Sequence, residues 1–171
     1  VTVIVPEIKT EASTDGKKET TIGGEITIED IVSYHNLTPG KEYVVKGTLM
    51  NKTTGKPVTV NDEPVTAEAA FTPETRDGEV KVAFIFNSYV ISETTDVVVF
   101  ESLYREEVEI AVHADIEDEG QSVTVYVPEI KTTASIDGKK EVTTAGKVTI
   151  EDVVSYTNLI PGTEYTIRGT L

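Results

Sequence analysis

Short segments in which apolar and polar residues alternate run along the whole chain, with the two-residue period of half-buried β-strands. In residues 8–12 the first, third and fifth positions share one face, and residues 26–34 continue the same alternation. Further strands are predicted at 42–49, 65–71, 80–86, 97–104, 108–112 and 122–127. Turns containing Gly or Pro separate many of these segments. The pattern predicts an all-β protein with an Ig-like β-sandwich.

An internal repeat divides the chain. Residues 1–49 align without gaps with residues 123–171, and 34 of the 49 aligned pairs are identical. The offset of 122 residues is too long for a solenoid but suits tandem sandwich domains. We therefore predict a complete domain at residues 1–122, followed at residues 123–171 by the N-terminal part of a second copy.

Composition excludes several classes of partner. Asp and Glu number 30 against 15 Lys and Arg, so the net charge is −15, and neither nucleic acid nor an anionic membrane is expected to bind. The chain has no cysteine, which leaves no disulfide or thiolate metal site. Neither a membrane span nor a signal peptide is found in these residues, so targeting or anchoring signals are expected outside them.

Four polar residues lie on faces that are otherwise apolar. They come from four different predicted strands and are Thr10, Asp30, Glu101 and Gln121. A buried carboxylate is costly unless it is paired or protonated, and two carboxyls brought together tend to share one proton. A structural interpretation stays open for two of them. Thr10 could be a small core residue bonded to backbone, and Asp30 could belong to a turn or bulge.

Residues 113–121, with the sequence H-A-D-I-E-D-E-G-Q, close the first repeat unit. They contain one of the two histidines of the chain, His113, together with several acids. Strict alternation places His113 on the same face as Glu109, opposite the apolar side of that strand. His113 is therefore expected to point outward unless a β-bulge turns its side chain inward.

The repeat also shows which of these polar positions recur. Thr10 recurs as Thr132 and Asp30 recurs as Asp152. The positions equivalent to Glu101, His113 and Gln121 would lie beyond residue 171, so Thr132 and Asp152 lack these partners within this chain. Exposed strand edges in the second copy are expected to allow pairing with another molecule.

These motifs resemble those of the intramolecular ester-bond domains, of the VaFE-repeat type, found in Gram-positive cell-surface adhesins. The resemblance covers residues 1–122 and the whole partial copy. It is carried by I-x-T-x-A at 8–12, T-I-E-D before V-S-Y-x-N-L-x-P-G-x-E-Y at 27–43, V-V-V-F-E-S-L-Y at 97–104 and the H-A-D-I-E-D-E-G-Q segment.

The resemblance implies a CnaB-like, Ig-like sandwich whose first and last strands are joined covalently. The implied bond is an ester between Thr10 Oγ and Gln121 Cδ, formed with release of ammonia. Because Thr132 and Asp152 lack their partners, no second cross-link is expected within this chain. The residues that match the family's acid and base positions are Glu101, His113 and Asp30, and those that match its further acids, expected to act in positioning, are Asp115 and Asp118.

The resemblance further implies a structural stalk domain of a cell-wall-anchored adhesin on the bacterial surface. Its partners would be neighbouring tandem repeats, with the host ligand bound by a separate tip domain. The bond would form in a single autocatalytic turnover, so no enzyme activity and no cofactor are expected. A cross-link would also explain how an extracellular domain without cysteine is stabilised.

Other interpretations of the same residues remain. Lys9 could form a Lys–Asn isopeptide bond, but no Asn lies between Asn87 and Asn158. The acids of residues 115–119 could bind Ca²⁺ or a protein ligand in an uncross-linked binding module, although their spacing fits no EF-hand loop. A hydrolase would be expected to show a Ser or Cys nucleophile motif, and none is present.

Overall fold

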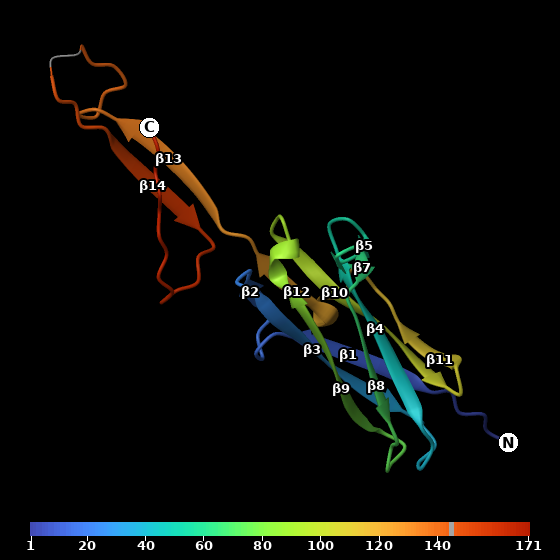
Figure 1. The fold of residues 1–171 in the computed structure, drawn as a ribbon. Coiled ribbons are helices and arrows are strands. Elements are labelled where there is room, and N and C mark those ends of the chain that lie inside the picture. Colours follow the sequence, from blue (N-terminus) through green and yellow to red (C-terminus); the bar gives the residue numbers. More distant parts are fainter. Residues whose placement is uncertain (144–145) are drawn as a thin grey trace. The chain divides into compact units, whose positions relative to one another are not determined.

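The computed structural model describes residues 1–143 and 146–171. They form two compact units, Val1–Tyr126 and Val127–Leu171 (Figure 1). Within the described residues, helix is confined to two 3₁₀ turns, η1 (Ser88–Val90) and η2 (Glu119–Gln121). None of the helices in this part of the chain is long and apolar enough to cross a membrane. The prediction of an all-β protein is confirmed.

The first unit contains twelve strands. They are β1 (Glu7–Ser13), β2 (Glu19–Thr21), β3 (Glu25–His35), β4 (Tyr43–Asn51), β5 (Lys56–Pro57), β6 (Thr59–Val60), β7 (Glu63–Pro64), β8 (Thr66–Phe71), β9 (Gly78–Asn87), β10 (Thr95–Arg105), β11 (Val108–His113) and β12 (Ser122–Tyr126). The eight strands predicted from alternation are all present. The short strands β2, β5, β6 and β7 were not predicted, because two or three residues are too few to show a period.

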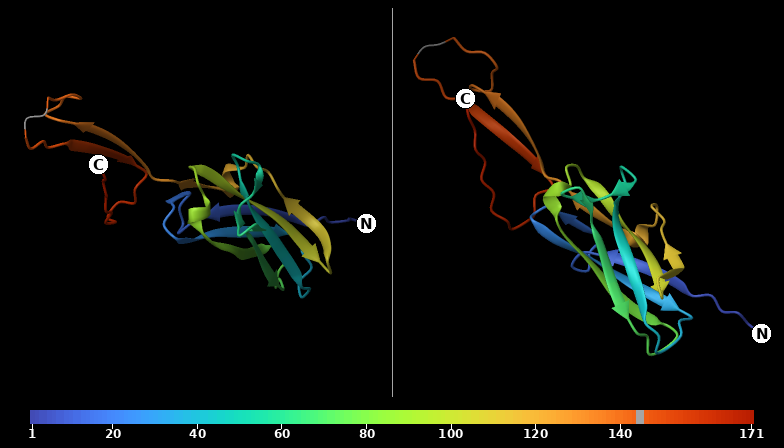
Figure 2. Two further views of the ribbon diagram at one scale, coloured as in Figure 1. Left: turned by 45° about the horizontal axis from the view of Figure 1, so that its top comes forward. Right: turned by 45° about the vertical axis from the view of Figure 1, so that its right-hand side comes forward.

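Two sheets stack to form the sandwich (Figures 1 and 2). One has the order β1-β3-β9, and the other has the order β2-β12-β10-β4-β5, with β8 paired to β4 and β11 paired to β10. Alternate residues of both sheets face inward, so the core takes one apolar side chain from every second position. Its fully buried members include Ala12, Ile28, Val32, Phe84, Val45, Leu49, Val99, Leu103, Val123 and Val125.

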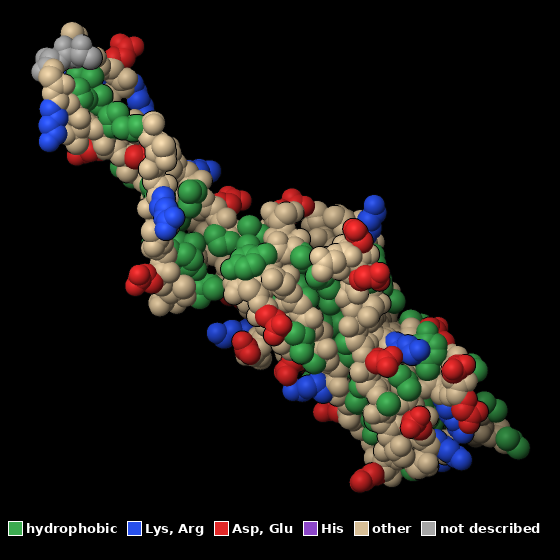
Figure 3. Space-filling view, in the orientation of Figure 1, with side chains coloured by type: hydrophobic (Ala, Val, Ile, Leu, Met, Phe, Trp, Pro, Cys, Tyr) green, Lys and Arg blue, Asp and Glu red, His purple; other side chains and the backbone are tan. Residues whose placement is uncertain are grey.

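The outer surface of the sandwich carries the negative charge. On the face shown in Figure 3, acidic side chains are spread among lysines, apolar residues and uncharged polar groups. This arrangement keeps like charges apart while retaining the net charge of −15, which favours solubility.

The edge of β10 opposite β4 is shared by two strands. Residues 95–98 of β10 pair with β12, and residues 101–105 pair with β11. Val99 and Phe100 have no ladder partner on that edge. The chain crosses this gap between β11 and β12 and includes the turn η2. The gap therefore brings η2 next to Glu101, the first residue of β10 that pairs with β11.

The second unit holds a two-stranded antiparallel sheet of β13 (Glu129–Ser135) and β14 (Glu151–Thr157). Thr132 pairs with Val154 in the same register in which Thr10 pairs with Val32. β14 is nevertheless shorter than β3, because residues 147–150 form no strand. In β3 the equivalent residues 25–28 pair with β9 alone, and the described part of the second unit has no counterpart of β9.

The border between the units differs from the border of the repeat. The repeat places residue 123 at the start of the second copy, whereas the structure divides the chain after Tyr126. The reason is that β12 belongs to the first sandwich, where Val123 and Val125 are fully buried and pair with β10. Residues 123–126 therefore close one sandwich and begin the next repeat.

Gly47 on β4 offers a test of this core. A Cβ at Gly47 would overlap the Phe84 ring and approach Glu101 Cγ to 3.4 Å. Gly47→Ala should therefore lower the free energy of unfolding by about 1–3 kcal/mol through overpacking. Urea denaturation followed by tyrosine fluorescence measures this change.

The repeat supplies the matched control for this variant. Gly169 is the equivalent of Gly47 in the second unit, and a Cβ there would meet no atom within 4 Å. Gly169→Ala should leave the denaturation midpoint of the first unit unchanged. An unchanged midpoint for Gly47→Ala would contradict the packing described here.

Candidate functional site

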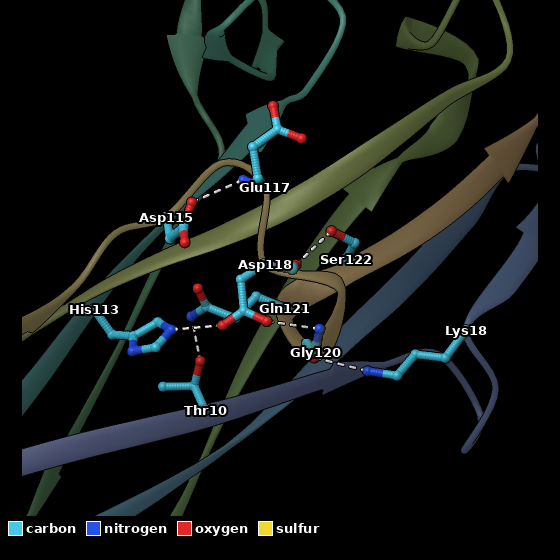
Figure 4. A network of polar contacts seen from close by, with 9 residues as sticks. All are labelled: Thr10, Lys18, His113, Asp115, Glu117, Asp118, Gly120, Gln121 and Ser122. Carbon is cyan, nitrogen blue, oxygen red and sulfur yellow. Dashed lines mark hydrogen bonds and ion pairs between the residues drawn. The ribbon is translucent and has the colours of Figure 1, made fainter.

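Thr10 and Gln121 meet where the edge strand β1 approaches η2. Ile8 and Ala12 on the same face of β1 are buried, and Thr10 between them is half-buried. Gln121 is the last residue of η2 and is fully buried. Its Nε2 donates a hydrogen bond to Thr10 Oγ1 across a sequence separation of 111 residues (Figure 4). The contact therefore joins the first strand of the sandwich to the segment that begins its last strand.

A pair of buried carboxyl groups lies beside this contact. Asp30 on β3 is paired in register with Ala12 of β1, and Glu101 comes from β10 in the other sheet. Both residues are almost completely buried. None of their four carboxyl oxygens has a hydrogen-bond partner within the described residues, and the same holds for Gln121 Oε1. Five acceptors without a donor are costly, which indicates that a proton is held in this cluster.

The pKa values of both carboxyls are raised, as expected for a buried pair that shares a proton. Burial, reinforced by the neighbouring Asp30, raises the pKa of Glu101 from 4.5 to about 10. Burial also raises the pKa of Asp30, but interactions with Glu101 and Thr10 partly offset this effect. Glu101 is therefore protonated at neutral pH, and its O–H can donate to one neighbouring oxygen of the cluster.

His113 reaches the site because β11 contains a β-bulge. The register between β10 and β11 shifts by one residue and leaves Ile110 without a partner. Beyond the bulge His113 pairs with Glu101, whose side chain points into the sandwich. The outward orientation expected from strict alternation is therefore wrong, and the bulge named as its exception is present.

Asp118 connects His113 to η2. His113 Nε2 lies 2.8 Å from Asp118 Oδ2, while Asp118 Oδ1 accepts a hydrogen bond of 2.7 Å from Gly120 N at the start of η2. The hydrogen bond with His113 lowers the pKa of Asp118, and the Gly120 N–H adds to this effect. One carboxylate thus orients the imidazole and caps the turn that carries Gln121 (Figure 4).

Asp115, in contrast, is not brought into the cluster. Its Oδ1 accepts a hydrogen bond from Glu117 N in the exposed connection between β11 and η2, so its contact is local. Glu117 instead forms an ion pair with Lys52 at 3.1 Å. The acids of residues 115–119 therefore point toward different partners. Within the described residues, no three His, Cys, Asp or Glu side chains are arranged to hold a metal ion.

The remaining residues singled out from the sequence lie on the exposed surface. Thr132 on β13 and Asp152 on β14 are both exposed. Lys9, which the isopeptide interpretation requires, is also exposed, on the face of β1 opposite Thr10.

Two residues at the site were not found by sequence reasoning. Lys18 Nζ donates to Ala12 O at 2.6 Å and to Gly120 O at 2.7 Å, so it connects β1 with η2. Gly47 pairs with Glu101 and leaves room for the Phe84 ring against that side chain. Both residues recur in the repeat, as Lys140 and Gly169, but recurrence alone does not separate them from the many other identical positions.

The fold is shared with a solved bacterial adhesin. Two crystal forms of the Mobiluncus mulieris adhesin containing intramolecular disulfide, isopeptide and ester bond cross-links superpose on this chain with TM-scores of 0.57 and 0.59. Each is 16% identical to the chain and covers 90% of it, and the chain covers 77% and 76% of the respective structures. No curated protein shows significant similarity. At this identity, the likeness establishes a common β-sandwich fold.

The family follows from the sequence match. The model of the T-Q ester bond containing domain matches residues 6–125 and again residues 128–171. Together these ranges include nearly the whole chain and both repeat copies. The chain therefore belongs to the family of T-Q ester bond containing domains, as its motifs indicated.

The raised pKa of Glu101 predicts a specific pH dependence of stability. Because the folded pKa exceeds the ordinary one, the contribution of Glu101 to stability is full below pH 4.5 and is lost as pH rises toward about 10. In a Thr10→Ala background, Glu101→Gln should remove a decline of roughly 1.4 kcal/mol per pH unit in that interval. Urea denaturation at a series of pH values measures the slope.

Glu109→Gln in the same background is the control, because Glu109 is an exposed carboxylate on the neighbouring strand β11. It should leave the slope unchanged. Equal slopes for the Glu101 and Glu109 variants would show that Glu101 does not hold a proton in the folded chain.

Proposed function

We propose that the first unit forms an intramolecular ester between Thr10 and Gln121. The observation that carries the proposal is the contact of Gln121 Nε2 with Thr10 Oγ1, beside a buried carboxyl pair. The family match supports it, because the chain belongs to a family defined by Thr–Gln ester bonds. A contact already formed in the folded chain supplies the proximity that an uncatalysed reaction between a hydroxyl and an amide lacks.

The reaction conserves all atoms of the two side chains except one ammonia. Thr10 Oγ attacks Gln121 Cδ, so that a C–O bond forms and the Cδ–Nε2 bond breaks. The hydroxyl proton leaves with the nitrogen, and the products are the ester and NH₃. No oxidant, reductant or cofactor is required. Water is the competing nucleophile, and burial of Gln121 limits its access.

One group of residues transfers the proton, and a second group stabilises the negative charge that develops. His113, held by Asp118, takes the Thr10 proton and returns it to the departing nitrogen, as the histidine of a hydrolytic triad does. The protonated Glu101 carboxyl, with Asp30 beside it, donates a hydrogen bond to the oxygen that becomes negative on Gln121. Each domain reacts once, so this is autocatalysis without substrate turnover.

The proposed cross-link suits a structural role on a cell surface. It would close a loop of 111 residues and remove roughly 4–5 kcal/mol of unfolded-state entropy on the chain-entropy model. Force applied between the two ends would then pass through the bond rather than through the sheets. We therefore propose a stalk domain of a bacterial cell-surface adhesin, with neighbouring repeats as partners and ligand binding in a separate tip domain.

The mass of the intact protein tests the bond. The parent chain should be lighter than its sequence by one ammonia, because Gln121 loses its side-chain nitrogen. Thr10→Ala and Gln121→Ala should each show their full calculated masses. Thr132→Ala, which changes the exposed second-unit threonine, should still show the loss of one ammonia.

Hydroxylamine distinguishes an ester from an isopeptide. Treatment of the unfolded parent should open the cross-link, whereas an isopeptide would resist cleavage. A parent with its full calculated mass would contradict the proposal, and so would a light parent whose cross-link survives hydroxylamine.

Removal of the imidazole should slow the reaction. His113→Ala should reduce the rate of ammonia loss by about 10²–10⁴-fold, the usual contribution of a positioned general base. Mass spectra taken at intervals after refolding measure the rate. His35→Ala removes the other, exposed histidine and should leave the rate unchanged. Equal rates for the two variants would remove His113 from the mechanism.

A further inference from the structure

Lys18 links the two segments that carry Thr10 and Gln121. Its ammonium group donates to Ala12 O, two residues after Thr10, and to Gly120 O, one residue before Gln121 (Figure 4). Hydrogen bonds from an ammonium group to carbonyl oxygens are charge-assisted and stronger than neutral ones. The lysine therefore lies across the junction in which the proposed ester forms.

A tight turn holds Lys18 in this place. The backbone N–H and C=O groups of Thr14 and Lys17 bond to each other in both directions, at 2.9 and 2.8 Å. The turn between them has positive φ at Asp15 (47°) and Gly16 (71°), as a two-residue hairpin turn requires. The chain reverses direction at this turn, so the side chain of Lys18 lies back along β1 and reaches Ala12 O.

The second unit shows that the lysine takes this position without η2. Lys140 Nζ donates to Ala134 O at 2.5 Å, and Ile136 and Lys139 form the same turn. The described part of that unit contains no counterpart of η2. The contact of the lysine with its own strand is therefore set locally, and Lys18 presents a preformed cation to the Gly120 carbonyl.

The charge of Lys18 also acts on the carboxyl pair. The charged groups that influence Asp30 are Glu101 from β10 and Lys18 from the turn after β1. The positive charge of Lys18 opposes the rise in the pKa of Asp30 that burial causes. It therefore favours the arrangement in which Asp30 is ionised and Glu101 keeps the proton.

We propose that Lys18 is a positioning residue for ester formation, which docks η2 on β1 and thereby holds the Gln121 amide against the Thr10 hydroxyl. The inference rests on the proposed reaction but adds a residue outside its acid–base set. Lys18 does not touch the reacting atoms, so its effect passes through the Gly120 backbone and through the charge near Asp30.

The test compares Lys18→Met with Lys17→Met, which removes a neighbouring exposed lysine from the same turn. The experiment starts from denatured chain in which the intact mass shows that Thr10 and Gln121 have not yet reacted. This chain is diluted into refolding buffer, and the loss of ammonia is followed by mass spectrometry. Lys18→Met should slow the loss at least about tenfold, because one charge-assisted hydrogen bond is missing from the reacting arrangement. Lys17→Met should react at the parent rate.

The pH profile separates positioning from general stability. Without the positive charge, Asp30 should become protonated at a higher pH, so the acid side of the rate profile of Lys18→Met should shift to higher pH. Lys18→Arg keeps the charge and should keep the acid side of the parent profile. Urea denaturation of Thr10→Ala with and without Lys18→Met establishes that the variant folds.

Each outcome decides between the two proposals. A parent that never loses ammonia overturns the proposed function and this inference with it. A parent that reacts, beside an equally fast Lys18→Met, overturns only the inference. Slowing by the same factor at every pH, without recovery in Lys18→Arg, assigns Lys18 to general stability and also overturns the inference.

Discussion

The burial of two carboxyl groups side by side is the constraint on which the rest of this sandwich depends. Asp30 and Glu101 come from opposite sheets and are almost completely buried, with no hydrogen-bond donor for their oxygens among the described residues. Because both groups are buried away from water, they cannot both be ionised, so the pair has to retain a proton. An apolar pair would pack at lower cost. The polar pair therefore fits the proposed chemistry at Thr10 and Gln121 better than a role in stability.

Several irregular features of the fold serve this one location. The gap on the edge of β10 admits η2, the bulge at Ile110 turns His113 inward, and Gly47 leaves space for Phe84 against Glu101. Each feature weakens regular strand pairing or packing. Their convergence on one cluster is typical of a functional site, where local rules are broken for a common purpose.

The two units act as an internal comparison between sequence and environment. Residues 25–28 and 147–150 are closely similar in sequence, yet only the first segment forms a strand. The β1–β3 pairing and the lysine turn recur in both units, because they depend on residues close to one another in the chain. Strands that need β9 or β10 as partners appear only in the first unit. Local sequence thus specifies the hairpin-like pairs and turns, whereas tertiary pairing completes the strands.

The sequence by itself determined the all-β class, eight of the strands and the inward set of Thr10, Asp30, Glu101 and Gln121, because side-chain direction follows the period of two. Only the tertiary structure decided the rest of the site. One extra residue in β11 moves His113 to the opposite face of the strand. The alternation of apolar and polar residues before the bulge gives no sign of this change. Asp118 and Asp115 differ through short-range contacts, Asp118 with His113 and Asp115 with the Glu117 N–H, and the path of the chain around η2 sets which contact each acid makes. The part taken by Lys18 depends on the Gly120 carbonyl, which lies 102 residues away in the chain. Contacts between residues so far apart leave no local pattern in the sequence, so only the folded structure reveals them.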